Sequence, residues 1–166
     1  MTSEPRVLQV LLVMASLSGN TRELGRMIAA RLHALGHRVV WQEADAPTGP
    51  VALCCDQADL VLLGTWTDNA GRTPAEMKGW VAEQARLQRV PAQVAVFGTG
   101  ETQWGEEYYC GALDRLARHY RSAYPILKIE QMPHGAHDAQ AVDDWIDAVL
   151  RQRAHAVPVD AMKECG

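Results

Sequence analysis

Along the chain, almost continuous apolar runs alternate with segments in which apolar residues are regularly spaced, and the changes of pattern mark the expected elements. Residues 6–15 (RVLQVLLVMA) are almost continuously apolar, which is typical of a strand covered on both faces. Residues 59–64 and 93–97 show the same pattern, whereas 37–42 is more polar and 126–129 is short. These segments are the five predicted strands.

Between the predicted strands, apolar residues recur every three or four positions, which is the spacing of a helix with one buried face. The first helix is expected to start after Asn20, which can cap it, with Glu23 completing a capping box. Gly36 is its predicted stop. A short helix is predicted around residues 52–57.

Longer helices are predicted further along the chain. One begins with Thr73 as its cap and Pro74 at its first position, and Glu76 closes a second capping box. Pro91 breaks this helix, and Asp138 is expected to cap the last one. The inward-facing residues are Met77, Trp80, Val81 and Leu87 in the first of these helices, Tyr109, Leu113, Leu116 and Tyr120 in the next, and Val142, Trp145, Ile146 and Val149 in the last.

Five strands that alternate with five helices predict an α/β fold, with a doubly wound parallel sheet and helices on both faces. The most apolar strands, the first, third and fourth, belong at the centre, which favours the strand order 2-1-3-4-5. In this order, ligands bind at the carboxyl ends of the strands, where the winding reverses. We expect one domain over residues 1–166, in which 153–166 is either a mobile tail or a segment that packs in an unpredictable way.

Three loops of unusual composition follow the first, third and fourth predicted strands. The first, 16–21 (SLSGNT), offers hydroxyls and an amide without any Lys or acid. The backbone N–H groups at the start of a helix make such a turn an anion site, so a phosphate held by neutral donors is expected there. The loop lacks the Lys of a Walker loop and the glycines of a dinucleotide fingerprint, and Ser16 stands where a Cys-dependent phosphatase has its thiol. An ordinary capped turn is the alternative.

The second loop, 64–73, and the third, 98–105, each carry a tryptophan among small and hydroxyl residues. Soluble proteins rarely expose tryptophan in a loop, so a planar heteroaromatic ligand beside Trp66 and Trp104 would explain these two side chains. Core packing is the alternative for Trp66, and packing against its own helix is the alternative for Trp104. A phosphate at one end and aromatic residues at the other favour flavin mononucleotide (FMN).

Composition narrows the class of protein. The formal net charge of −4, without a basic cluster, argues against a nucleic-acid partner. The chain has no stretch apolar enough to span a membrane and no basic start typical of a signal peptide, so a cytoplasmic protein is expected. The four cysteines form no CxxC pair, and Cys54 and Cys55 are expected to be reduced, partly buried thiols in the short helix.

The remaining polar clusters have simpler explanations than catalysis. His134, His137 and Asp138 imitate a metal site, but a polar loop before a helix cap accounts for them. The sequence offers no credible pair of nucleophile and base. Neither a metal nor an enzymatic activity is therefore expected.

Two motifs resemble those of a known family. SLSGNT resembles the phosphate loop of flavodoxins, and residues 97–116 (FGTGETQWGEEYYCGALDRL) resemble their third flavin loop and the helix after it. The resemblance covers essentially the whole chain, and the fifth strand has no long insertion, as in short-chain members. By this likeness the phosphate loop comprises Ser16, Leu17, Ser18, Gly19, Asn20 and Thr21, with Thr67 reaching the phosphate from the second loop. Likewise, the ring site comprises Gly98, Thr99, Gly100, Glu101 and Gln103 along the pyrimidine and ribose edges, and Trp104 on the outer ring face.

The second loop departs from the family pattern. Many flavodoxins have an aromatic residue where this chain has Asp68, so either Trp66 or a smaller side chain covers the inner ring face. The glycine that usually lets a peptide flip toward flavin N5 is absent early in the loop, so Asp68-Asn69 and Asn69-Ala70 both stay open as the flipping peptide. The loop contributes Thr65, Trp66, Thr67, Asp68, Asn69 and Gly71 to the predicted site.

The resemblance implies a low-potential one-electron carrier that is monomeric and shuttles electrons between a reductase and acceptor proteins. Nearby carboxylates such as Glu101 disfavour the anionic reduced flavin, which lowers its potential. Two alternatives stay open. One is the flavodoxin-like activator of class Ib ribonucleotide reductase, and the other is an NADPH-dependent quinone or flavin reductase on the same fold.

Overall fold

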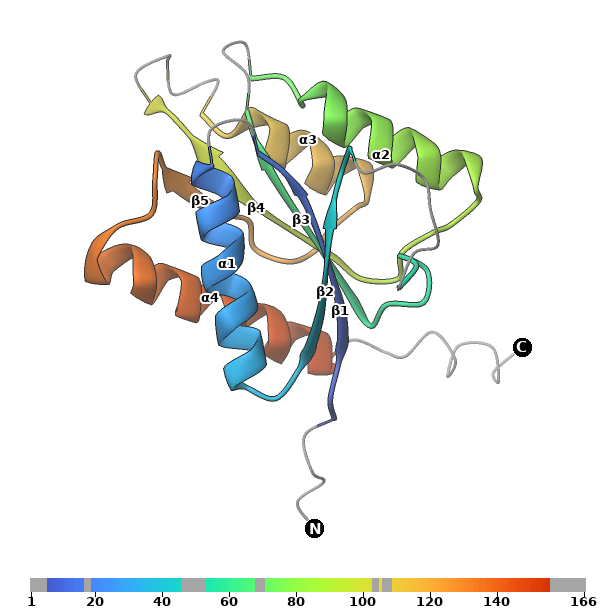
Figure 1. Cartoon of the computed structure of the whole chain (residues 1–166), viewed down its shortest axis with the longest axis horizontal. Helices are drawn as coiled ribbons and strands as arrows, with labels where there is room; N and C mark the ends of the chain where they lie inside the picture. The colour runs from blue at the N-terminus through green and yellow to red at the C-terminus, as the bar shows by residue number, and fades with distance from the viewer. Residues whose placement is uncertain are drawn as a thin grey trace.

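A five-stranded sheet forms the centre of the molecule in the computed structural model, which describes residues 6–16, 19–45, 53–67, 71–102, 105 and 109–155. All strands are parallel, in the order β2-β1-β3-β4-β5, so the predicted fold class is confirmed (Figure 1). The strands are β1 (Gln9–Ala15), β2 (Arg38–Glu43), β3 (Leu60–Trp66), β4 (Val94–Gly100) and β5 (Leu127–Glu130). The helices are α1 (Asn20–Ala34), α2 (Ala75–Arg86), α3 (Gly111–His119) and α4 (Gly135–His155).

Two helices cover each face of the sheet, α1 with α4 on one and α2 with α3 on the other (Figure 1). Successive residues of β1 point to opposite faces and join two separate apolar cores. Val10, Leu12 and Met14 pack with α1 and α4, and Leu11, Val13 and Ala15 pack with α2 and α3. Both faces are therefore apolar, which explains the unbroken hydrophobic run of the sequence.

Several predicted boundaries are wrong by a few residues. β1 begins at Gln9, because Gln9 is the first residue with a partner in β2. β3 and β4 continue to Trp66 and Gly100, so the first residues of the predicted second and third loops are strand. They stay paired because the register joins Trp66 to Thr99.

The prediction of a short helix around residues 52–57 is wrong, because residues 55–57 form a turn. The N–H groups of Gln57 and Ala58 both donate to the carbonyl oxygen of Cys54, at 3.0 and 3.1 Å, so the chain folds once and then enters β3. Residues 51 and 52 lie outside the described residues. Four helices therefore occur in the part of the chain that the structure describes, where five were predicted.

Neither predicted cap at the start of α2 and α4 forms as expected. The N-cap of α2 is Pro74, and no side chain caps this helix, so Thr73 does not form the predicted capping box. α4 begins at Gly135, and Asp138 accepts a hydrogen bond of 3.0 Å from the N–H of His134. Asp138, in the first turn of α4, thus caps the helix by accepting from the residue that precedes Gly135.

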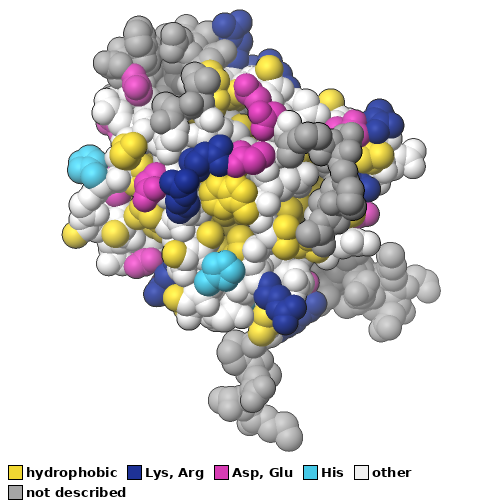
Figure 2. All heavy atoms as spheres, viewed as in Figure 1, with side chains coloured by type: hydrophobic (Ala, Val, Ile, Leu, Met, Phe, Trp, Pro, Cys, Tyr) yellow, Lys and Arg dark blue, Asp and Glu magenta, His cyan; other side chains and the backbone are white. Residues whose placement is uncertain are grey.

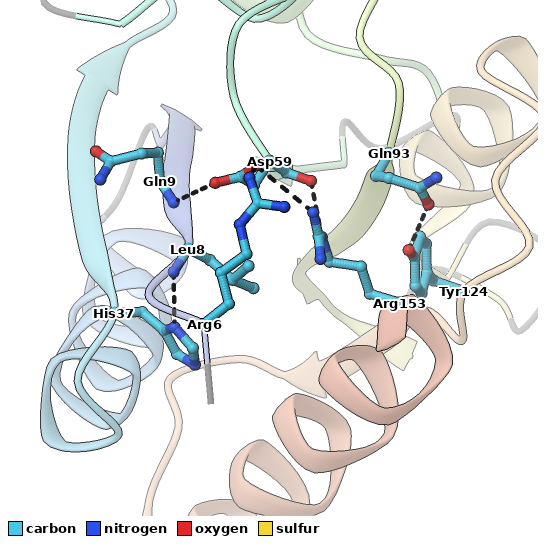
Figure 3. A network of polar contacts seen from close by, with 8 residues as sticks. All are labelled: Arg6, Leu8, Gln9, His37, Asp59, Gln93, Tyr124 and Arg153. Atoms are coloured by element: carbon cyan, nitrogen blue, oxygen red, sulfur yellow. Dashed lines mark hydrogen bonds and ion pairs between the residues drawn. The ribbon is translucent and has the colours of Figure 1, made fainter. Parts of the chain in front are cut away.

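A network of polar contacts closes the end of the sheet where the strands begin (Figure 3). The carboxylate of Asp59, just before β3, accepts hydrogen bonds from the N–H of Gln9 at 2.8 Å and from Arg6 at 3.0 Å. Arg153 at the end of α4 donates to the carbonyl oxygen of Asp59 at 3.0 Å. Asp59 therefore joins β1, β3 and α4.

Within the described residues, the helices are all too short or too polar to cross a membrane. The predicted tail is partly helical, because α4 extends to His155, and residues 156–166 lie outside the described part of the chain.

Candidate functional site

The loop between β1 and α1 is organised by one hydroxyl. Ser16 Oγ accepts hydrogen bonds from the N–H groups of Gly19, at 3.2 Å, and Arg22, at 3.3 Å. Gly19 has φ of 90°, a left-handed conformation that costs other residues energy, and it is the N-cap of α1. Leu17 and Ser18 lie outside the described residues.

Asn20 is the first residue of α1 and the N-cap Gly19 has no side chain, so the predicted capping box is wrong, and Ser16 instead accepts from the N–H of Arg22 in the first turn. The chain turns at Gly19, one residue earlier than predicted, which places Asn20 inside the helix. The N–H groups of Asn20 and Thr21 have no carbonyl of their own helix to donate to, because no helical residue precedes them by four. Together with the helix dipole, these donors make the start of α1 suited to an anion.

The cation nearest this loop is already paired. The guanidinium of Arg22 binds both carboxylate oxygens of Glu43 at the end of β2, and Trp41 donates from Nε1 to the same carboxylate at 3.1 Å. The hydrogen bond from Arg22 lowers the pKa of Glu43 below its ordinary value. On the face that carries α1 and β2, basic and acidic side chains lie beside one another around apolar surface (Figure 2). The start of α1 therefore offers an anion neutral donors, with its nearest guanidinium committed to Glu43.

A buried hydrogen bond connects the first loop with the third. The hydroxyls of Thr21 in α1 and Thr99 in β4 lie 2.7 Å apart, and these residues are only 1% and 4% exposed. Thr21 is in the first turn of α1, and Thr99 is the last residue but one of β4. The contact links the two predicted subsites across the end of the sheet.

The second loop begins in β3. Thr65 is fully buried, and its hydroxyl donates to the carbonyl oxygen of Trp66 at 3.0 Å. Thr67 Oγ1 accepts a hydrogen bond of 3.3 Å from the N–H of Ala112, in the first turn of α3. Gly71 packs so closely that a Cβ on Gly111 would lie 2.8 Å from its carbonyl oxygen. Asp68 and Asn69 lie outside the described residues.

Trp66 is half-buried at the rim and belongs to neither apolar core of the described residues. It lines an open cavity of about 360 Å³ at the start of α2. The other lining residues are Arg72, Thr73, Pro74, Ala75, Glu76 and Lys78. The core-packing alternative for Trp66 is therefore not what the structure has.

The third loop starts while the chain is still in β4. Gly98 is required there, since a Cβ would lie 2.0 Å from the carbonyl oxygen of Thr65 in the neighbouring strand. The carboxylate of Glu130, at the end of β5, accepts hydrogen bonds from the hydroxyl and the N–H of Thr102. Gly100 and Glu101 are half-buried between these anchors. Gln103 and Trp104 lie outside the described residues.

Glu43 and Glu130 were not predicted as parts of the site. Each stands at the carboxyl end of an edge strand, β2 or β5. In a parallel sheet these ends lie at the same rim as the ligand loops, so a charged residue there was a usable signal.

The two buried thiols of the described residues, those of Cys55 and Cys110, are unsuited to nucleophilic catalysis. Burial raises the pKa of Cys110, which lies against Gly100, to about 12, and that of Cys55 to about 11. Both stay protonated near neutral pH, so neither is a thiolate nucleophile. Cys55 is buried and Cys54 partly buried, in the turn before β3. Side chains of His, Cys, Asp and Glu form no cluster of three suited to a metal within the described ranges.

Comparison with known proteins establishes the family. Residues 12–123 match the family model described as flavodoxin. The chain is 30% identical over 147 residues to "Probable flavodoxin 2" of Bacillus subtilis, which covers 81% of this chain and 90% of that protein. It is also 30% identical over 135 residues to "Protein NrdI" of Deinococcus radiodurans, which covers 81% of each chain.

Solved structures agree. Oxidised flavodoxin 2 from Bacillus cereus matches 87% of this chain and 99% of its own, with a TM-score of 0.70 and 26% identity. A flavodoxin from Streptococcus pneumoniae has the same fold, with a TM-score of 0.72, 22% identity, and coverage of 87% of this chain and 99% of its own. With a family match from β1 to β4, a relative along most of its length and the strand order described above, the chain belongs to the flavodoxin family.

Proposed function

We propose that this protein is an FMN-dependent, low-potential one-electron carrier that shuttles electrons between a reductase and acceptor proteins. The observation that carries the proposal is the start of α1, where the N–H groups of Asn20 and Thr21 have no acceptor within the helix. This start lies at the same rim as the ends of β3 and β4 and is bonded to β4 through Thr21 and Thr99. An anion site beside two loops that can flank a planar ring fits flavin mononucleotide better than it fits a free phosphate. We further propose a single-domain, cytoplasmic monomer without nucleic-acid or membrane partners.

The phosphate end of FMN is assigned to residues 16–21. The N–H groups of Asn20 and Thr21 have no acceptor within α1 and can donate to an anion, and Ser16 holds Gly19 in the turn before them. The pairing of Arg22 with Glu43 supports recognition by neutral donors, because it withdraws the nearest guanidinium. Thr67 is the proposed contribution of the second loop.

The ring end is assigned to Trp66 and to the third loop. FMN, when bound, supplies the one-electron chemistry, and this chain excludes water from it and sets the charge around it. Gly98, Thr99, Gly100, Glu101, Gln103 and Trp104 are the proposed third-loop contacts, with Asp68, Asn69 and Gly71 from the second. Thr99 contributes its backbone to this end, because its hydroxyl is bonded to Thr21. Glu101 and Glu130 bring negative charge to this end, which opposes the gain of charge on reduction and favours a low potential.

The test is the visible spectrum of the purified protein during stepwise reduction. We expect a yellow protein with one tightly bound FMN, reduced in two separate one-electron steps, and much weaker binding of riboflavin, which lacks the phosphate. Ser16→Ala should weaken FMN binding, because the turn loses the acceptor for two N–H groups. Ser122→Ala, which removes a hydroxyl bonded to the carbonyl oxygen of Val94 at the opposite end of β4, is the matched control. A colourless protein that refuses added FMN would refute the proposal.

A second candidate is the flavodoxin-like activator of class Ib ribonucleotide reductase, which the identity of 30% to Protein NrdI supports. Activation of the dimanganese form of that reductase by the purified protein, together with a poorly separated pair of reduction steps, would favour it. Turnover of NADPH with a quinone by the isolated protein would instead indicate a reductase on this fold.

A further inference from the structure

We propose that Thr99 is a positioning residue for phosphate, whose buried hydroxyl orients the hydroxyl of Thr21 toward the anion at the start of α1. This inference rests on the proposed binding of FMN. It assigns to the ring-side strand β4 a role in recognising the opposite end of the ligand.

The geometry places the two hydroxyls in a closed contact. Their oxygens lie 2.7 Å apart, and both residues are almost fully buried, so water does not compete for this hydrogen bond. In the sheet order, β3 separates β1 from β4, yet the contact joins the loop after β1 directly to the end of β4. It connects loops that the sheet itself does not make neighbours.

A hydroxyl has one proton to donate and can accept further bonds, so a hydroxyl pair has two possible directions. If Thr99 donates to Thr21, the proton of Thr21 is free for another acceptor. If Thr21 donates to Thr99, its oxygen turns lone pairs toward the surroundings and would repel an anion. Either hydroxyl can be the donor in this contact.

A phosphate at the start of α1 selects the first direction. The N–H groups of Asn20 and Thr21 bring the anion to the first turn of α1, beside the Thr21 hydroxyl. Bonds to a charged acceptor are about twice as strong as neutral ones, and a chain of hydroxyls polarises along its length. Thr99 then donates to Thr21, and Thr21 donates to the anion.

Two other hydroxyls at this rim, those of Thr65 and Thr67, have partners of their own. Thr65 donates to the carbonyl oxygen of Trp66, and Thr67 accepts from the N–H of Ala112. Thr99 therefore acts through Thr21, and its effect should disappear when the Thr21 hydroxyl is removed.

The experiment is a double-mutant cycle with Thr21→Val and Thr99→Val, read as dissociation constants of FMN and riboflavin. Thr99→Val should weaken FMN about five- to tenfold, the usual cost of one buried hydrogen bond in a polar network, and change riboflavin less than about twofold. Thr21→Val should weaken FMN at least as much. The double variant should bind FMN no more weakly than Thr21→Val alone.

Two further variants complete the design. Thr99→Ser restores the hydroxyl and should restore FMN affinity, and Ser122→Ala should change neither ligand. If Thr99→Val does not fold, Thr99→Ala removes the same hydroxyl with less bulk. Additive losses in the cycle, an equal loss for riboflavin, or unchanged FMN affinity would each overturn the role of Thr99. Failure of the unaltered protein to bind FMN would instead refute the proposed function.

Discussion

Histidine 37 shows how a single side chain at the end of the sheet away from the loops makes stability depend on pH. Its Nδ1 accepts a hydrogen bond of 3.1 Å from the N–H of Leu8, which requires that nitrogen to be unprotonated (Figure 3). Burial, and then the charge of Arg153, lower the pKa of His37 below 6.5. Asp59 and Arg6 are the other charged groups in this network.

Because the pKa of His37 is lower in the folded than in the unfolded protein, the unfolded state binds the proton more tightly. The stabilisation is complete above about pH 6.5 and is lost as pH falls through that value toward the lowered pKa. We expect the urea concentration at the midpoint of unfolding to decrease as the pH is lowered from about 8 to about 5.5. His37→Asn keeps an acceptor without a titrating group, so its midpoint should fall less over the same range, and equal falls in both proteins would contradict this assignment.

The residue scale also marks where sequence reasoning reached its limit. Ser16, Thr21 and Thr99 are recognisable from their motifs, but the Thr21–Thr99 bond depends on how α1 lies across the sheet. Caps were misplaced by one residue because the φ of Gly19 (90°) and the ψ of Pro74 (152°) decide them, and a sequence pattern gives neither angle. The pair of Arg22 and Glu43 depends on strand register, which no local pattern specifies.

At the scale of elements, two helical glycines have opposite surroundings. A Cβ on Gly79 in α2 would meet no other atom within 4 Å. A Cβ on Gly25 in α1 would lie 2.4 Å from Met14 Cε and 2.9 Å from the ring of Trp41. The absence of a side chain at Gly25 therefore lets α1 approach β1 and β2 closely.

Gly79→Ala should stabilise the protein by about 0.5–1 kcal/mol, because alanine favours the helix without a new contact. Gly25→Ala gains the same propensity but must displace Met14 and Trp41, so it should be neutral or destabilising. Chemical unfolding of both variants against the unaltered protein measures the difference. A comparable gain in both would show that Met14 and Trp41 move aside freely.

The elements themselves were largely predictable, because burial sets the hydrophobic pattern. β1, β3 and β4 are the central, buried strands, as their apolar runs predicted. The turn around Cys55 was mistaken for a helix because a few residues cannot distinguish one helical turn from a helix. Residues 103 and 104 of the predicted site lie outside the described part of the chain.

At the scale of the whole molecule, a network that stabilises the fold and the loops of the proposed function lie at opposite ends of the sheet. Asp59 holds β1, β3 and α4 together at the end where the strands begin (Figure 3). The loops assigned to FMN lie at the end where the strands finish. Changes at one end should therefore leave the other unaffected.

Asp59→Asn tests this separation. The amide still accepts from the N–H of Gln9, but the charge that pairs with Arg6 and Arg153 is lost, and the Asp59 side chain is only 17% exposed. We expect a loss of about 1–2 kcal/mol in the free energy of unfolding, with unchanged FMN affinity. Glu83→Gln, which breaks a pair with Arg86 on an exposed part of α2, should have no measurable effect on either quantity. Loss of FMN affinity in Asp59→Asn would mean that the two ends are coupled.

The network around Asp59 also determines where this molecule can be attached to a surface or to another protein. Arg6 and Arg153 both reach Asp59, so the first described residue and the end of α4 emerge beside each other, at the pole opposite the three loops. A linker to an electrode surface, or a flexible fusion to a donor enzyme, attached near either residue would therefore leave the pole with the proposed FMN site facing outward.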